Sequence, residues 1–395
     1  MSGALKRDEW ETVRLEDVAT YVSDRIDASL LDTHNYVSVE NLLADRRGIK
    51  DSENVPQTGR FIQYVSGDVL IGNIRPYLKK IWLAIHEGGT NGDVLVIRPN
   101  NSKNLSSEYL YHSLASDVFF NYAMQNAKGA KMPRGDKKLI MKYSFPLPPI
   151  DIQHRIADTL DKVTELIDLR KKQLEKLDEL VKARFVEMFG DLASPECKWN
   201  REKLVDACVN SDDIKCGPFG TQLSKDEYVD TGVAVWEIPQ INSLFVTTPT
   251  HYLTEEKARQ LEAYSIKSGD IAMSRKGNVG KCAVFPSNFE AGIIHSDVLR
   301  IRVDGSRVLP LFMMHQLHYS GAVQHQIELV SSGAIMAGIN VTKLKQIFIH
   351  IPPMELQNQF VAFVEQTDKS KAIIQQSLDT LETLKKSLMQ EYFGQ

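Results

Sequence analysis

Lysine and arginine gather at three places in the chain where their charge could meet phosphate groups. Residues 128–142 hold six basic side chains and one acid, Asp136, in a stretch whose glycines and proline indicate a loop. Residues 274–281 contain three basic side chains and no acid. Backbone in glycine-rich loops approaches phosphates closely, arginine suits guanine edges and lysine suits phosphates. These clusters predict contact with nucleic acid; an exposed basic loop without a partner is the alternative.

The third group, Arg75, Lys79 and Lys80, lies in the first half of the chain at a place comparable to residues 274–281. Gln222 follows a Gly-Pro-Phe-Gly turn, where it either reads an adenine edge or belongs to a purely structural turn. The residues predicted to contact DNA are Arg75, Lys79, Lys80, Lys128, Lys131, Arg134, Lys137, Lys138, Gln222, Ser274, Arg275, Lys276 and Lys281.

Motifs for catalysis are missing from the sequence. Residues 277–281 superficially resemble a phosphate-binding loop, but Arg275 stands where that loop needs glycine, and Cys282 stands where it needs serine or threonine. The chain also lacks the Asn/Asp-Pro-Pro-Tyr/Phe segment of amino-methyltransferases, a G-x-S-x-G elbow and a nuclease carboxylate cluster. We therefore expect no catalytic residue in this chain; if DNA is cut or modified, another chain does it.

No metal site is predicted either. His315 and His318 form an H-x-x-H without further ligands nearby, which favours positions on a helix face or in the core. The cysteines lack the paired spacing of a zinc or redox site and are expected to be free thiols; they are Cys197, Cys208, Cys216 and Cys282.

The elements that must position the basic clusters occur twice, about 204 residues apart. The stretch from Pro148 to Gly190 aligns without a gap on the stretch from Pro352 to Gly394. Weaker matches precede it in the same order, so a whole unit is duplicated. They are Leu15–Ala19 with Leu204–Cys208, Ser66–Leu70 with Ser268–Ala272, Asp93–Arg98 with Asp297–Arg302, and Gly129–Met132 with Gly333–Met336.

Both repeated tails predict long helices of about 38 residues that begin just after a Pro-Pro pair. Apolar side chains recur at spacings of three and four, which is coiled-coil periodicity, and we expect the two helices to pair with each other. Two helices packed separately on their own domains are the alternative. The predicted seam consists of Ile156, Leu160, Val163, Ile167, Leu174, Leu177, Val181, Phe360, Val364, Ile374, Leu378, Leu381 and Leu388.

Short β-branched and aromatic runs in each half predict strands, for example Val94–Ile97, Val233–Trp236 and Val298–Val303. Helices are expected at Ser107–Gln125 and Leu311–Leu329. The predicted fold class is α+β, with two tandem globules related by a pseudo-twofold axis, each followed by a long helix, and with the two helices paired as an antiparallel coiled coil. The predicted boundaries are 1–147 and 191–351 for the globules, and 148–190 and 352–395 for the helical regions.

The net charge of −4 does not oppose DNA binding. Residues 151–191 and 355–395 each carry a balance of −2, so the repeated tails account for the whole deficit and the remainder is neutral. No apolar run approaches the ~18–20 residues that span a bilayer, and the first residues lack the apolar segment of a secretory signal. We expect a cytoplasmic protein that does not enter a membrane.

From end to end the chain resembles the specificity subunits of type I restriction-modification systems. The resemblance is carried by the segments that open the helices, by the Ser-Gly-Asp-Ile turn and by three further stretches. These are PLPPIDIQHRIADTLDKV, IHIPPMELQNQFVAFVEQ, Gly217–Thr221, Met273–Gly277 with Gly280-Lys281, and Tyr36–Asn41. The first half departs from the pattern, with Asp24–Ile26 in place of the Gly-Pro-Phe-Gly turn and Gly72–Arg75 in place of Ser274–Gly277.

The resemblance implies a non-catalytic DNA reader with two target-recognition domains, each binding half of an asymmetric bipartite site in double-stranded DNA. It also implies that the paired helices set the distance between the half-sites. A helix of ~38 residues is about 57 Å long, which matches roughly 17 base-pair steps. The helices would dock two modification (methyltransferase) subunits and, through them, ATP-dependent restriction subunits. S-adenosylmethionine, ATP and magnesium would belong to those partners, leaving this chain without a cofactor.

Two other functions fit parts of the pattern. A protein-interaction scaffold would use the repeated coiled coil and show no DNA selectivity. A detached specificity fragment of a fused restriction-methyltransferase would have its catalytic motifs outside this chain, and the absence of such motifs here counts against it.

Overall fold

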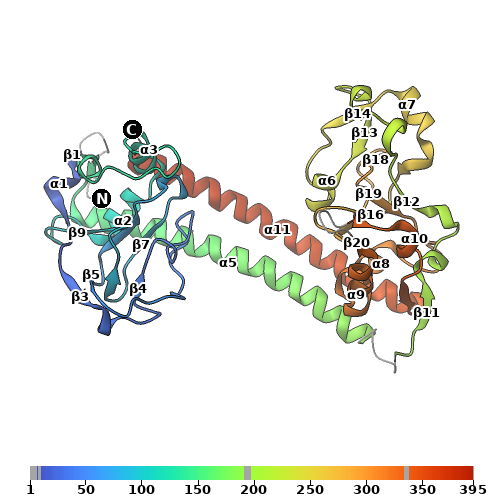
Figure 1. The fold of residues 1–395 in the computed structure, drawn as a ribbon, viewed down its shortest axis with the longest axis horizontal. Helices are drawn as coiled ribbons and strands as arrows, with labels where there is room; N and C mark the ends of the chain where they lie inside the picture. The colour runs from blue at the N-terminus through green and yellow to red at the C-terminus, as the bar shows by residue number, and fades with distance from the viewer. Residues whose placement is uncertain (1–6, 8–9, 191–196, 333–337, 395) are drawn as a thin grey trace, which may run out of the picture. The chain divides into compact units, whose positions relative to one another are not determined.

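The computed structural model describes the chain except for residues 1–6, 8–9, 191–196, 333–337 and 395. The chain divides into two compact units. Unit 1 comprises Met1–Lys172 and Gln375–Gln395, and unit 2 comprises Gln173–Ile374. The division passes through both long helices, so each unit combines one globule with a part of each helix (Figure 1).

The two long helices are α5 (Ile150–Phe189) and α11 (Met354–Phe393), each of 40 residues. Both begin at or just after the Pro-Pro pair, as the sequence predicts, because a proline lacks the N–H that a preceding helix would need. Helix α5 ends at Phe189, and the next residue, Gly190, has a φ of 74°, the left-handed conformation that closes many helices.

The helices pair in opposite directions, which confirms the predicted antiparallel arrangement. In unit 1 the first turns of α5 share a core with the last turns of α11, and Lys171 pairs with Glu382 at 3.0 Å. In unit 2 the last turns of α5 meet the first turns of α11, and Asp178 pairs with Lys371 at 2.6 Å. The beginning of each helix therefore lies beside the end of the other.

The predicted seam residues fall into two groups by burial. Most of those near the globules are buried, whereas most of those toward mid-helix are half-buried, because a pair of helices without a third layer covers only a narrow stripe. The buried residues are Ile156, Leu160, Val163, Ile167, Val181, Phe360, Val364 and Leu378. The half-buried ones are Leu174, Leu177, Ile374, Leu381 and Leu388.

The globule of unit 1 contains a two-stranded and two four-stranded sheets (Figure 1). In sheet order the strands are β1 (Glu11–Arg14) and β10 (Ser144–Leu147); then β2 (Ala19–Tyr21), β9 (Val94–Pro99), β6 (Val69–Gly72) and β7 (Ile81–Leu83); then β3 (Arg25–Asp27), β5 (Arg60–Tyr64), β8 (Gly88–Thr90) and β4 (Tyr36–Val37). The helices are α1 (Leu15–Val18), α2 (Ser107–Leu114), α3 (Asp117–Gln125) and α4 (Lys137–Ile140).

The globule of unit 2 repeats this plan. Its strands, in the same order of sheets, are β11 (Asn200–Lys203) and β22 (Phe348–Ile351); then β12 (Ile214–Cys216), β19 (Val298–Ile301), β16 (Ile271–Ser274) and β17 (Cys282–Val284); then β14 (His251–Leu253), β13 (Val233–Trp236), β18 (Gly292–Ile294) and β15 (Ser265–Ile266). A further pair joins β20 (Ser331–Ser332) to β21 (Gly338–Ile339). Its helices are α6 (Ile238–Asn242), α7 (Glu255–Gln260), α8 (Pro310–Tyr319), α9 (Gly321–Val330) and α10 (Val341–Leu344).

The last four-stranded sheet of each globule shows where the two halves diverge. Both contain a central strand, β8 or β18, with one parallel and one antiparallel neighbour. The fourth strand is added on opposite sides: β3 extends the antiparallel neighbour β5 in unit 1, and β14 extends the parallel neighbour β13 in unit 2. The duplicated framework therefore carries different edges in its two copies.

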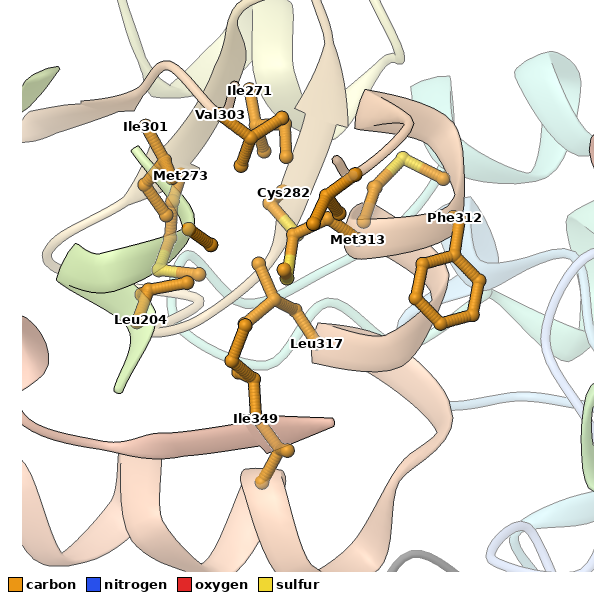
Figure 2. Close-up of a cluster of buried hydrophobic side chains, with 14 of the residues drawn as sticks. Leu204, Ile271, Met273, Cys282, Ile301, Val303, Phe312, Met313, Leu317 and Ile349 are labelled. Carbon is orange, nitrogen blue, oxygen red and sulfur yellow. The ribbon is translucent and has the colours of Figure 1, made fainter. Parts of the chain in front are cut away.

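The main core of unit 2 lies between the sheet β12-β19-β16-β17, helix α8 and the paired helices. In Figure 2, Cys282 extends from the sheet toward Met313 and Leu317 of α8, and Met273 lies beside Leu204 in the same core. Unit 1 has the corresponding core around Val69, Ile97 and Tyr109. All four cysteines are free, as expected.

Two expected helices are each interrupted by a serine. Ser116 separates α2 from α3 and Ser320 separates α8 from α9, and each hydroxyl accepts a hydrogen bond from the backbone N–H three residues later. A serine oxygen that satisfies a free N–H favours a helix start, so one apolar stretch becomes two short helices.

Two buried glutamines tie the long helices to the globules. Gln153 accepts a hydrogen bond from the Ser106 N–H at 3.0 Å, and its amide donates to the carbonyls of Asn104 and Pro148, both at 2.8 Å. Gln357 repeats this set with the Leu309 N–H and the carbonyls of Arg307 and Pro352. Because both side chains are fully buried and fully bonded, the direction of each helix from its globule is tightly defined.

Because His315 is buried, we expect unit 2 to lose stability in mild acid. It is buried against Tyr319 and Phe360, and burial, followed by the nearby His318 and Lys371, lowers its pKa from 6.5 to about 3. Below about pH 6.5 this histidine is therefore protonated in the unfolded chain but stays neutral in the folded unit. The free energy of unfolding consequently falls as the pH drops below 7. We expect a loss of about 1–2 kcal/mol between pH 7 and 5 from this residue.

The measurement is urea denaturation at several pH values with a His315→Leu variant. Its stability should depend less on pH than that of the unchanged protein over this range. The control is His325→Leu, because His325 lies on α9 with a side chain 70% exposed. Equal pH dependence in the unchanged protein and the His315 variant would contradict the prediction.

No helix within the described ranges is long and apolar enough to cross a membrane.

Candidate nucleic-acid interface

In unit 1 the two predicted basic clusters form one surface. The turn between β6 and β7 lies against the loop that follows α3, because the Arg75 N–H donates to the Pro133 carbonyl at 2.7 Å and the Gly135 N–H donates to the Asn73 carbonyl at 3.1 Å. We call residues 73–80 and 127–136 the unit 1 loop pair. The bonded residues of the two segments are 58 and 62 positions apart in sequence, so their proximity was not predictable from local patterns.

Unit 2 builds a loop pair at the equivalent place. The Ile339 N–H donates to the Arg275 carbonyl at 3.1 Å, and the Arg275 side-chain Nε returns a bond to the Ile339 carbonyl at 3.1 Å. We call residues 274–281 and 338–340 the unit 2 loop pair. The preceding residues 333–337, which include the predicted repeat Gly333–Met336, lie outside the described residues.

Two backbone bonds establish which residues correspond between the loop pairs. The Asn73 N–H donates to the Asp93 carbonyl at 2.9 Å, and the Arg275 N–H donates to the Asp297 carbonyl at 2.8 Å. The carbonyls of Asn73 and Arg275 then accept from Gly135 and Ile339. Asn73 and Arg275 therefore occupy the same position, which carries an amide in one copy and a guanidinium in the other.

Several predicted cations of unit 1 are already engaged within the protein. Lys79 pairs with Asp117 at 2.7 Å, Lys128 with Asp136 at 2.8 Å, and Arg134 with Asp93 at 3.1 Å. Lys80 donates to the Val39 carbonyl at 2.5 Å, and burial lowers its pKa. These side chains shape the loops as well as adding charge.

Other cations of unit 1 have charged groups that pair with no described residue. The side chains of Arg75, Lys131 and Lys138 are exposed and make no hydrogen bond or ion pair within the part of the chain that the structure describes. The Lys137 ammonium makes, among the described residues, only a long bond of 3.4 Å to the Gly92 carbonyl. Among the predicted residues of unit 1, these four are the best placed to meet phosphates or bases.

The predicted cations of unit 2 are partly engaged. The Arg275 guanidinium lies 5.1 Å from the ring centre of Phe219, whose side chain is 47% exposed. Lys276 pairs with Asp297 at 2.8 Å, and Lys281 donates to the Asn242 carbonyl at 2.9 Å. The Arg275–Phe219 pair is thus a cation stacked on an exposed aromatic ring.

Two of the residues predicted to contact DNA are engaged within the fold of unit 2. Ser274 is fully buried in strand β16. The side-chain oxygen of Gln222 accepts from the Phe219 N–H and from the Tyr264 hydroxyl, both at 3.1 Å, which corresponds to the structural-turn alternative. We omit both from the proposed contact surface.

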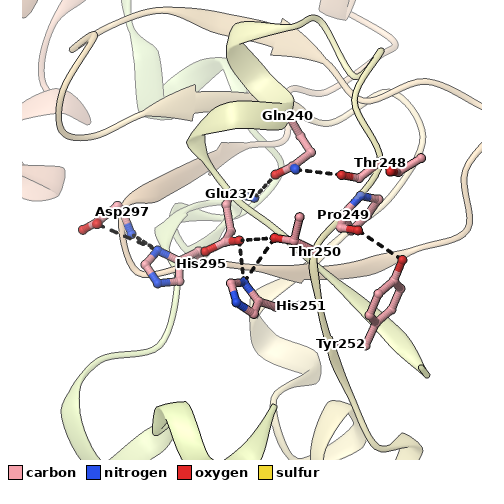
Figure 3. Close-up of polar contacts among 9 residues, drawn as sticks. All are labelled: Glu237, Gln240, Thr248, Pro249, Thr250, His251, Tyr252, His295 and Asp297. Carbon is pink, nitrogen blue, oxygen red and sulfur yellow. Dashed lines mark hydrogen bonds and ion pairs between the residues drawn. The ribbon is translucent and has the colours of Figure 1, made fainter. Parts of the chain in front are cut away.

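Asp297, which pairs with Lys276 of the unit 2 loop pair, lies among polar contacts shown in Figure 3. The Asp297 N–H donates to Nδ1 of His295 at 3.2 Å, which directs the turn that carries Asp297. In the same view, Glu237 lies 2.8 Å from Nδ1 of His251. Within the described ranges, no group of three or more His, Cys, Asp or Glu side chains is arranged to hold a metal ion.

The sequence did not identify the acids that restrain these cations. Asp93 and Asp297 occur in a matched pair of segments, so the duplication marked their positions without indicating their partners. Asp117 brings together Lys79 and Arg46, and only tertiary packing places it there. Acids of this kind prevent mutual repulsion within a basic loop and hold its side chains in place.

Comparisons with known proteins agree with this geometry. The family model described as "Type I restriction modification DNA specificity domain" matches residues 7–179 and 219–383. The type I restriction enzyme MjaVIII specificity subunit of Methanocaldococcus jannaschii is 24% identical, over 98% of this chain and 93% of that protein. The EcoBI specificity subunit of Escherichia coli is 20% identical, over 82% of this chain and 73% of that protein.

Solved structures show the same fold. A chain from a study titled as the structural basis of complex assembly and conformational transition of the type I R-M system aligns with a TM-score of 0.61 and 21% identity, covering 98% of both chains. The S subunit of a type I restriction-modification system from M. genitalium aligns with a TM-score of 0.60 and 12% identity, covering 100% of this chain and 97% of that chain.

Proposed function

The chain belongs to the type I restriction-modification DNA specificity family, whose model matches both of its halves, and from this premise we propose that it reads a bipartite DNA sequence. Each globule binds one half of an asymmetric site in double-stranded DNA. The chain is a non-catalytic specificity subunit, and the proposed reaction, methylation or cleavage, belongs to its partners. Its place of action is the cytoplasm, where the DNA is.

The single observation that carries this proposal is that the unit 1 and unit 2 loop pairs share one backbone arrangement but present different side chains. Their backbones are held by the same hydrogen bonds, from Asp93 through Asn73 to Gly135 and from Asp297 through Arg275 to Ile339. The side chains that they present differ in charge and in kind. A duplicated framework with different contact residues suits the reading of two different half-sites.

We further propose that the helices set the distance between the half-sites and dock two modification subunits. Support for equivalent docking comes from exposed apolar residues at matched positions of the repeat. Leu169 and Ile373 are 48% and 71% exposed, and Leu180 and Leu384 are 48% and 44% exposed. Apolar side chains repeated on both helices are typical of a surface that meets the same partner twice. Restriction subunits join through the modification subunits.

Methylome sequencing of the host with and without this gene tests the proposal. The expected result is the loss of one bipartite methylated motif when the gene is deleted. An unchanged methylome, together with equal affinity of the purified chain for all duplexes, would favour the scaffold alternative and overturn the proposal.

Replacing Arg275 and Lys276 by alanine is expected to weaken binding at one half-site by about 1–3 kcal/mol, because a base contact and a phosphate contact are lost. The measurement is titration of duplexes that carry changes in either half-site. Lys267→Ala and Lys345→Ala serve as charge-matched controls in unit 2, since both lysines lie outside the loop pair. If the double variant keeps full affinity and specificity, these residues do not belong to the interface.

A further inference from the structure

The tip of the unit 1 loop pair presents an aromatic ring that the sequence analysis did not select. Tyr77 lies in the single turn Pro76–Leu78 between β6 and β7, and its side chain is 51% exposed. Its hydroxyl makes no hydrogen bond within the described part of the chain. Arg75 is exposed beside it, with an unoccupied guanidinium. An apolar ring and a cation thus project together from one turn.

The backbone of this tip is unusual. Arg75 and Lys79, on either side of the turn, have φ values of 53° and 50°, in the left-handed region that side chains rarely adopt. Asp45 and Arg46, in a neighbouring segment, have φ values of 56° and 61°. Four of the six non-glycine residues with positive φ in the described ranges therefore meet at this tip. Such conformations persist only where surrounding contacts hold them, and they gather at functional sites.

Contacts from three segments hold the tip in place. The N–H groups of Asp45 and Arg46 donate to the carbonyls of Leu78 and Lys79, at 2.9 and 3.0 Å. The Arg75 N–H donates to Pro133 across the loop pair, and the Lys79 ammonium is held by Asp117 of α3. The turn that carries Tyr77 is therefore rigid before any partner binds, so little conformational freedom is lost on contact.

The equivalent turn of unit 2 is built differently. There the left-handed positions are occupied by Gly277 and Gly280, with φ values of 67° and 82°, and the turn contains no aromatic residue. Glycine adopts these angles without strain. The exposed aromatic ring of unit 2 comes instead from Phe219, stacked with Arg275. Each unit thus has one exposed aromatic ring beside an arginine of its loop pair, and the two rings come from different turns.

We propose that Tyr77 is a specificity-determining residue of the first half-site, in contact with base edges and flanked by Arg75. This inference rests on the proposed function. The ring supplies apolar contact to a base edge such as the methyl group of thymine, and the neighbouring guanidinium supplies contact to a guanine or a phosphate. The surrounding charge favours DNA as the occupant, because Lys131 and Lys138 are also exposed and unoccupied.

The test uses the full-length chain and duplexes that contain the motif found by methylome sequencing, with every base pair of both half-sites changed in turn. Tyr77→Ala should lower the affinity for the motif roughly tenfold and reduce discrimination at one or two adjacent base pairs of one half-site. Tyr77→Phe keeps the ring and should stay within about threefold of the unchanged protein. Ile85→Ala is the matched control. Ile85 is 76% exposed beyond the far end of β7, so this variant should bind the motif with the affinity of the unchanged protein.

The outcomes separate this inference from the proposed function. If the unchanged chain prefers no sequence, the proposed function fails first. If it is selective and Tyr77→Ala shows the same affinity and the same base preferences, the inference alone is overturned. A Tyr77→Ala variant that reads DNA normally but no longer assembles with modification subunits would identify Tyr77 as a protein contact, which also overturns it. A melting temperature unchanged by the substitution excludes loss of folding as the cause.

Discussion

Replacing Phe360 by alanine is expected to lower the free energy of unfolding of unit 2 by about 3–5 kcal/mol, the range for removing a buried aromatic side chain. Phe360 lies in the second turn of helix α11 and is fully buried. Its ring lies 5.5 Å from the rings of Phe185 and Phe189 at the end of α5, and 5.4 Å from His315 of α8. One substitution therefore loosens the contact between both long helices and the globule.

The effect is large because this ring cluster is packed from three helices, α5, α8 and α11. Phe312 of α8 also contacts Phe185 and Phe189, at ring distances of 6.0 and 4.9 Å, so the cavity would open inside a cluster held from three helices. Helices confined on several sides relax little into a void, and the cost approaches the upper end of the range.

Hydrogen exchange combined with urea denaturation measures this effect, since a chain with two units need not unfold in one step. Exchange should accelerate in β16, β19 and α8, while unit 1 stays protected. Ile373→Ala on the same helix is the control, because a side chain 71% exposed should change stability by at most about 0.5 kcal/mol. A loss below about 1 kcal/mol for the Phe360 variant would show that the cluster does not hold the unit together.

Removing one heptad from both long helices is expected to abolish methylation at the original motif and to transfer it to a motif with a shorter spacer. The deletion takes residues 171–177 from α5 and residues 375–381 from α11, which are equivalent in the repeat. Each helix shortens by about 10.5 Å, close to three base-pair steps. Recognition in each globule should survive, because the loop pairs are untouched.

The deletion is chosen to preserve the pairing of the helices. Seven residues complete two turns of the seam repeat, so the apolar stripe stays in phase. Of the ion pairs that join the two helices, Asp178–Lys371 is kept, whereas Lys171–Glu382 loses its lysine. Of the removed seam residues, Leu174, Leu177 and Leu381 are half-buried and Leu378 is buried, so the deletion also removes some apolar contact between the helices.

Methylome sequencing of cells that carry the shortened gene measures the outcome. Deleting residues 171–177 alone breaks the register of the pair and should abolish methylation at every motif. Replacing the exposed residues Lys172 and Glu175 by alanine keeps the helix length and should leave the motif unchanged. A doubly shortened protein that still methylates the original motif would refute the role of the helices in spacing.

The long helices show how much of this fold is predictable from local sequence. Proline pairs mark their starts, a spacing of three and four residues marks their buried side, and a gapless repeat indicates that two copies exist. Each of these signals acts between residues a few positions apart, so it is legible along the chain. Predictions failed first where a polar side chain competes locally, as at Ser116 and Ser320, whose hydroxyls divide helices that apolar content alone would join.

What the sequence determined by itself is the duplicated plan: two α+β globules, two antiparallel helices and three basic clusters. Tertiary structure decided which clusters share a surface and which cations are unoccupied, because backbone bonds such as Arg75 to Pro133 and ion pairs such as Lys276 to Asp297 join residues distant in sequence. It also decided that Tyr77 projects from a rigid turn, since that turn is held by Asp45, Arg46 and Pro133. Composition reveals charge, but burial and pairing decide which charge is available to DNA.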